Sequence, residues 1–165
     1  TMVVHNPESN MGNAVGCSPV GDLLEAGVTV GLGTDGYTSD MFESLKVANL
    51  IRRHASGDPG AGWVEVPRMV FENNRQILSR FYPHPVGRLE PGAYADIILV
   101  DYQAPTPLLR DNWFGHLLFG FNGGLVDTTI VGGKVVMQGR QIVSVDEALI
   151  AERARNLAAS LWERF

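Results

Sequence analysis

The sequence contains little of several features that would assign a protein to a particular class. It has one cysteine, Cys17, in 165 residues, so no disulfide can form within the chain, which fits a reducing compartment such as the cytoplasm. Its 13 basic residues are outnumbered by 18 acidic ones, and no basic stripe could serve as a nucleic-acid footprint. No apolar run approaches membrane-spanning length. We therefore expect a cytoplasmic protein whose partners include neither nucleic acid nor a membrane.

Motifs that would supply a complete catalytic site are also absent. The four histidines form no H-x-H or H-E-x-x-H spacing, so the chain holds no complete metal site of a known pattern. Residues 16–20 lack the second glycine of the G-x-S-x-G nucleophile elbow, and Ser18 is better explained as a helix cap. Cys17 is expected to be a small packing residue, because no base near it in sequence could activate a thiol.

What is present is the composition of a globular protein, with 45% hydrophobic and 19% charged residues. The length suits one domain with a real core, or one small domain and part of another. The chain begins with Thr1 and an apolar strand, Met2–His5, that is already under way. We therefore expect a fragment of a longer protein.

The first part of the chain predicts a βαβ unit. After the strand Met2–His5, residues 8–13 are expected to form a polar loop. Ser18 and the proline after it start a helix that ends at Gly27. A strand over residues 28–32 follows at once, and this order is typical of a parallel sheet.

Later elements are predicted from apolar spacing and turn residues. Asp146 is expected to cap a final helix that runs through Phe165. The pair Gly132-Gly133 supplies the positive φ angles of a primed hairpin turn. Helices are further predicted over residues 41–56, 67–81 and 113–121, and strands over residues 96–101, 126–131, 134–137 and 141–145.

Residues 28–36 are the main candidate for a functional segment, because an apolar strand ends there in glycines and Asp35. Three interpretations compete: a metal ligand, a dinucleotide loop and a tight turn. Residues 31–36 match G-x-G-x-x-G, but the helix after them is not followed by the strand and ribose-binding acid that this fold needs. Asp35 would also place a negative charge where a phosphate must lie. We consider this match accidental.

The metal interpretation rests on Asp35 at the carboxyl end of a strand, where α/β folds hold ligands. His5, at the end of another strand, could present an imidazole to the same pocket. The pattern alone favours a turn residue at position 35 over a ligand, and a lone histidine at a strand end, such as His5, is commonly just hydrogen-bonded in place.

The order of segments resembles the amidohydrolase superfamily, in the aminohydrolase and chlorohydrolase branch that includes purine deaminases and triazine hydrolases. The matching segments come in the family's order and cover most of the chain. Asp40-Met41-Phe42-Glu43 is most similar to the SsnA-type aminohydrolases. The motifs that carry the resemblance are Val4-His5-Asn6-Pro7-Glu8-Ser9-Asn10-Met11, Gly33-Thr34-Asp35-Gly36, residues 87–101, and Val131-Gly132-Gly133-Lys134-Val135-Val136.

The resemblance implies an α/β fold: the C-terminal part of a TIM-like (β/α)8 barrel, then strands of a small β-sandwich domain and a closing helix. Residues 1–83 would hold the last two barrel strands and their helices. Residues 84–145 would form the sandwich portion, and residues 146–165 the closing helix.

The resemblance also implies roles for three residues. Asp35 would be a metal ligand and a catalytic residue that shuttles a proton from the attacking water. His5 and Asn10 would contact the substrate, and Asn10 would also organise its loop. The cofactor would be a divalent metal, zinc before iron, completed by ligands outside this chain, because the family's histidines and catalytic glutamate would precede Thr1.

The expected function is that of the C-terminal portion of a metal-dependent amidohydrolase that deaminates or dechlorinates a small heterocyclic substrate such as a purine. The full-length protein is expected to be a homo-oligomer, and the isolated chain to be inactive. The alternative is a truncated or degenerate barrel module that serves assembly only.

Overall fold

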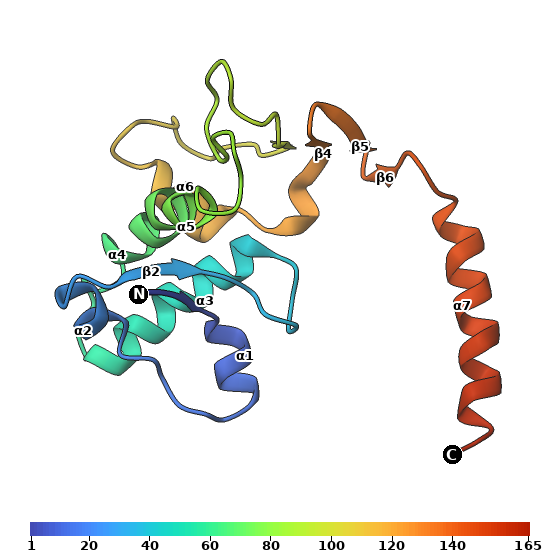
Figure 1. Cartoon of the computed structure of the whole chain (residues 1–165), viewed down its shortest axis with the longest axis horizontal. Helices are drawn as coiled ribbons and strands as arrows, with labels where there is room; N and C mark the ends of the chain where they lie inside the picture. Colours follow the sequence, from blue (N-terminus) through green and yellow to red (C-terminus); the bar gives the residue numbers. More distant parts are fainter. The chain divides into compact units, whose positions relative to one another are not determined.

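Figure 1 shows a computed structural model that describes residues 1–165. The chain divides into two compact units. One comprises Thr1–Tyr94 and Tyr102–Leu125, and the other comprises Ala95–Asp101 and Val126–Phe165. The division into a barrel part, a sandwich part and a closing helix at residues 83 and 145 stays a prediction.

The first unit opens with the predicted βαβ arrangement. Strand β1 (Met2–His5) pairs in parallel with β2 (Thr29–Leu32), and His5 lies opposite Leu32 in the register. Helix α2 (Val20–Glu25) lies between the two strands in sequence. Because the strands are parallel, their carboxyl ends meet at one edge of the sheet, which is where His5 and the segment leading to Asp35 emerge.

The segment between β1 and α2 was predicted to be a loop, and that prediction is wrong. Residues Pro7–Gly12 form helix α1. Pro7 occupies the start of the helix, where its fixed φ is already helical and its missing N–H is not needed. Glu8 stands in the first turn, where a carboxylate is favoured by the helix dipole.

Two smaller predictions around α2 are also wrong. The Ser18 side chain does not cap the helix; instead its carbonyl accepts a hydrogen bond from the Val20 amide at 2.8 Å. Pro19 holds the N-cap position and cannot donate, so the helix begins later than the serine signal indicated. Cys17 does not pack in the core, because it lies exposed in the segment before Pro19.

Helix α3 (Met41–Ser56) has the predicted bounds and is closed at both ends. The Asp40 carboxylate accepts hydrogen bonds from the amides of Phe42 and Glu43, as an N-cap does. Gly57 ends the helix in the left-handed conformation, with φ of 66°.

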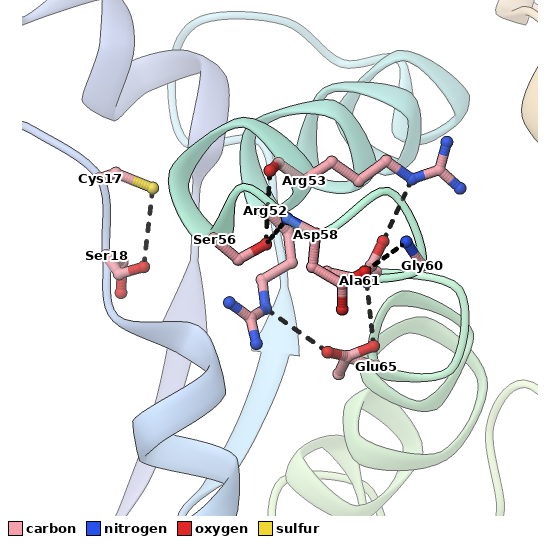
Figure 2. Close-up of polar contacts among 10 residues, drawn as sticks. Cys17, Ser18, Arg52, Arg53, Ser56, Asp58, Gly60, Ala61 and Glu65 are labelled. Carbon is pink, nitrogen blue, oxygen red and sulfur yellow. Dashed lines mark hydrogen bonds and ion pairs between the residues drawn. The ribbon is translucent and has the colours of Figure 1, made fainter.

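The loop after α3 is tied back to that helix by two arginines (Figure 2). Arg53 donates from Nε to the Ala61 carbonyl at 3.1 Å. Arg52 lies 3.4 Å from the Glu65 carboxylate, which also accepts a hydrogen bond from the Gly62 amide. These contacts fix the start of the next helical run.

That run covers most of the predicted helix over residues 67–81, but it contains a π-helical turn. It consists of α4 (Glu65–Arg68), the π-helix η1 (Met69–Asn73) and α5 (Asn74–Leu78). The wider turn sets two amides against β2: Asn73 donates to the Val30 carbonyl at 2.7 Å, and Asn74 bonds both N and O of Leu32 at 2.9 Å.

The core of this unit lies between β2 and the helices. Helix α6 (Trp113–Gly120), predicted from its apolar run, contributes to it, and the 3-10 turn η2 (Gly123–Leu125) closes the unit. Burial of these apolar side chains is the main stabilising contribution. The buried members are Val20, Val30, Leu32, Leu45, Ala48, Val66, Met69, Phe114, Leu117 and Leu118.

The second unit is an antiparallel sheet followed by a helix. Its strands are ordered β3 (Ile97–Val100), β4 (Val126–Val131), β5 (Lys134–Gln138) and β6 (Gln141–Ile142). The predicted hairpin turn is confirmed, with φ of 55° and 78° at the two glycines. Helix α7 (Glu147–Trp162) is capped by Asp146 as predicted, and none of its residues is buried. No helix in either unit combines the length and apolarity needed to cross a bilayer.

Candidate active site

The candidate site lies just beyond the carboxyl end of β2. Gly33 and Thr34 extend the chain past the strand, and residues 35–37 form a turn. Asp35 is exposed and has a φ of 55°, in the left-handed region that aspartate tolerates better than most residues. This conformation turns the chain away from the sheet directly after the carboxylate.

The Asp35 carboxylate is held by a hydrogen bond at each oxygen. Its Oδ2 accepts from the Ser9 hydroxyl at 2.9 Å, and its Oδ1 accepts from the Gly36 amide at 2.6 Å. A carboxylate oxygen has two acceptor positions, so one remains on each oxygen. The group is therefore oriented by the protein and still able to bind a cation or accept a proton.

Ser9 reaches Asp35 because residues 7–12 form a helix and not the expected loop. Ser9 is buried, and the amide group of Asn13 donates to the Ser9 carbonyl at 2.9 Å and to its hydroxyl at 3.3 Å. No local pattern around Ser9 predicts this contact. The signal that could have revealed the helix is Pro7 at a first helical position followed by an acidic residue.

His5 is placed at the same edge of the sheet, but its ring faces another environment. Its backbone carbonyl accepts from the Gly33 amide at 2.9 Å, which joins the ends of β1 and β2. His5 borders a cavity of about 10 Å³ with residues of α2, α3 and α4, and neither Asp35 nor Asn10 lines that cavity.

Burial determines the protonation state of His5. The side chain is 5% exposed, and its Nδ1 atom is buried without a hydrogen-bond partner. Burial lowers the pKa of the imidazole from its usual value, because the charged form loses its hydration. Burial therefore favours the neutral form of the His5 imidazole.

Asn10 lies on α1, one turn from the start of the helix. Its amide donates to the Asn6 carbonyl at 3.0 Å, and its carbonyl accepts from the Val15 amide at 3.1 Å. The backbone of Asn10 thus organises the segment after α1. Its half-buried side chain makes no hydrogen bond within the chain. Contact of His5 and Asn10 with a substrate stays a prediction.

The donor set of the chain suits one position of a metal site. No group of three or more histidine, cysteine, aspartate and glutamate side chains is arranged to hold an ion. Asp35 can offer one oxygen ligand, and ligating carboxylates are commonly hydrogen-bonded by neighbouring groups, as Asp35 is by Ser9. A catalytic zinc site needs about three protein ligands. The residues present therefore fit a metal only as a partial site.

Comparison with known proteins connects this arrangement with a family of hydrolases. The amidohydrolase family profile matches residues 1–136. A 5-methylthioadenosine/S-adenosylhomocysteine deaminase from Pelotomaculum thermopropionicum is 40% identical over 98% of the chain, and a 5'-deoxyadenosine deaminase from Methanosarcina acetivorans is 39% identical over 98%. The chain spans 38% of the length of each relative.

Solved structures give the same result for the fold. An adenosine deaminase from Xanthomonas campestris with bound zinc matches 98% of the chain and 38% of its own, with a TM-score of 0.79 and 26% identity. An atrazine chlorohydrolase from Arthrobacter aurescens matches 93% of this chain and 35% of its own chain, with a TM-score of 0.68 and 24% identity. At this identity the likeness supports the fold alone. The chain is α/β, and by profile, sequence and fold it belongs to the amidohydrolase family.

Proposed function

We propose that the chain is the C-terminal portion of a metal-dependent amidohydrolase that removes the exocyclic amino group of an adenine-containing nucleoside or a related heterocycle. The observation that carries this proposal is the Asp35 carboxylate, held at the carboxyl end of β2 with an acceptor position left on each oxygen. Relatives of about 40% identity named as deaminases of adenosine derivatives support the substrate class.

In this proposal residues 1–83 form the last two strands of a (β/α)8 barrel with their helices, and the strands β3 to β6 belong to a small sandwich domain. The remaining barrel strands and metal ligands lie outside residues 1–165. The zinc in the related adenosine deaminase supports zinc as the metal. A bound divalent metal would supply Lewis acidity and make a nucleophile available at neutral pH.

Asp35 has two tasks in the proposed reaction. One carboxylate oxygen would serve as a ligand of the metal, and the carboxylate would accept a proton from the attacking water. The water oxygen forms a bond to the ring carbon, the bond from that carbon to the amino nitrogen breaks, and the proton leaves with ammonia. An exposed carboxylate that a hydrogen bond holds in place suits this shuttle. It can take a proton from the water and pass it to the departing amino nitrogen.

The experiment uses the full-length protein that contains this chain. Zinc content and release of ammonia from 5'-deoxyadenosine, 5-methylthioadenosine and S-adenosylhomocysteine are measured for the wild type and for Asp35→Ala. The variant should lose activity and most of its zinc. After metal removal from both proteins it should keep the thermal unfolding midpoint of the metal-free wild type, because Asp35 is exposed. Asp22→Ala, which removes another exposed aspartate on α2, is the matched control.

Two results would overturn the proposal. Full activity in Asp35→Ala would remove Asp35 from the site. If the zinc-loaded full-length protein turned over neither these nucleosides nor a chlorinated triazine, the assembly-only alternative would take the place of the enzyme.

A further inference from the structure

The turn that carries Asp35 is docked on helix α1 by two side-chain contacts. Besides the hydrogen bond from Ser9 to Asp35, the ring of Tyr37 lies over Gly12: a Cβ atom added at Gly12 would come within 2.4 Å of the ring. One face of α1 thus holds both ends of the turn over residues 35–37. The position of the carboxylate depends on where α1 lies.

Helix α1 is itself anchored to α3 by a buried hydrogen bond. The hydroxyl of Ser44 donates to the Glu8 carboxylate at 2.6 Å, and the two residues are 0% and 6% exposed. Glu8 precedes Ser9 directly, so the hydroxyl that reaches Asp35 is next to a fixed point. Without the hydrogen bond from Ser9, the exposed Asp35 carboxylate would be held only by the Gly36 amide of its own turn.

The hydrogen bonds of Ser9 specify the direction of its proton. A hydroxyl has one donor and two acceptor positions. The Asn13 side chain donates to the Ser9 hydroxyl at 3.3 Å and to the Ser9 carbonyl at 2.9 Å. Asn13 therefore occupies an acceptor position of the hydroxyl, whereas Asp35 receives its proton. The hydroxyl proton is then directed at Asp35 Oδ2, at 2.9 Å.

We propose that Ser9, oriented by Asn13, is a positioning residue that holds the Asp35 carboxylate in its metal-binding orientation. This inference rests on the proposed function, in which Asp35 is a ligand. Ser9 touches neither metal nor substrate and acts only through Asp35. The hydrogen bond leaves one acceptor position on each oxygen of Asp35 and removes rotamers in which the carboxylate points into solvent.

The test measures zinc affinity of the full-length protein by competition with a chromogenic chelator, alongside turnover. Ser9→Ala should weaken zinc binding about 10- to 100-fold, the usual effect of removing a group that orients a ligand. Ser9→Thr keeps the hydroxyl and should restore most of the affinity, a rescue that a purely structural role would not predict. Ser79→Ala removes an exposed hydroxyl from the end of α5 and should bind zinc as the wild type does.

Asn13→Asp gives a second, independent variant on an exposed position. It replaces the donor to Ser9 by an acceptor, so the hydroxyl can turn from Asp35 to residue 13, and zinc binding should weaken in the same direction. If Ser9→Ala fails to fold, Asn13→Asp alone tests the inference. Wild-type zinc affinity in Asn13→Asp overturns the inference, and weakened zinc binding supports it.

The outcome separates this inference from the function on which it rests. Wild-type zinc affinity in a folded Ser9→Ala variant, together with loss of zinc in Asp35→Ala, overturns the role of Ser9 and leaves Asp35 a ligand. Wild-type zinc affinity in Asp35→Ala overturns the proposed function itself.

Discussion

The buried pair of Ser44 and Glu8 should be the main anchor of α1, and its removal has a calculable effect. The Ser44 hydroxyl donates to the carboxylate of Glu8, a residue that is 6% exposed. A hydrogen bond to a charged group contributes about 1.5–3 kcal/mol, and a buried acceptor left without a donor retains its desolvation cost. Ser44→Ala should therefore lower the free energy of opening α1 by about 2–3 kcal/mol.

Native-state hydrogen exchange is the measurement, because it reports local opening of α1 in the full-length protein. Since about 1.4 kcal/mol is a factor of ten, peptides that cover residues 7–13 should exchange roughly 30- to 150-fold faster in Ser44→Ala. Ser56→Ala is the matched control: it removes an exposed hydroxyl at the far end of the same helix, α3, and should leave these peptides unchanged.

A double variant tests the physical reason. Replacement of both hydrogen-bonding partners by apolar groups removes the unpaired buried charge, so Glu8→Met with Ser44→Ala should exchange more slowly than Ser44→Ala alone. The reasoning is refuted if Ser44→Ala leaves exchange over residues 7–13 at the wild-type rate, or if the double variant exchanges faster than Ser44→Ala alone.

Two further predictions concern the edge of the sheet beside the site. Gly33→Ala places a Cβ atom 2.5 Å from Asn6 Oδ1 and 2.7 Å from Val4 Cγ1, so it should lower the free energy of unfolding, measured by chemical denaturation, by about 1–3 kcal/mol. Gly36→Ala is the control and should leave this free energy unchanged, because its Cβ atom meets nothing within 4 Å. Equal effects of the two substitutions would contradict the predicted crowding at Gly33. Burial lowers the pKa of His5 below its unfolded value of 6.5, so the unfolded state binds more protons between the two pKa values. Stability should therefore be lost as the pH falls from 6.5 through the folded pKa. The thermal unfolding midpoint of His5→Asn should fall less over this pH range than that of the wild type. A larger fall in His5→Asn would contradict a lowered pKa of His5.

Local signals predicted some elements with their bounds. Helix α3 could be predicted over Met41–Ser56 because its start and end are encoded next to it, by Asp40 and Gly57. The hairpin turn at Gly132 and Gly133 could be predicted for the same reason. Its positive φ angles favour glycine, and glycine occupies both turn positions. Both depend on interactions between residues close in sequence.

The missed features depend on residues far apart in the chain. Ser9 and Asp35 are 26 positions apart, and Asn73 and the Val30 carbonyl are 43 apart, so neither contact has a local signal. Helix α1 differs from the predicted loop for another reason: the polar residues 8–13 indicate a loop, but Pro7 before them also suits the first position of a helix. The resemblance to a family predicts a role for Asp35, and that role stays a prediction; only the fold shows what holds its carboxylate.

The structure also gives a physical reason against the dinucleotide interpretation of residues 31–36. That interpretation needs a helix that starts at the glycine loop and offers free amides to a pyrophosphate. Helix α3 starts at Met41, beyond the turn, and its first amides already donate to the carboxylate of Asp40, whose other oxygen accepts from the Gly123 amide at 2.7 Å. A phosphate would have to displace one carboxylate and approach a second, Asp35. Two aspartates five residues apart thus have opposite consequences: Asp40 uses its oxygens to satisfy backbone amides, whereas Asp35 keeps an acceptor position on each oxygen, which suits a cation.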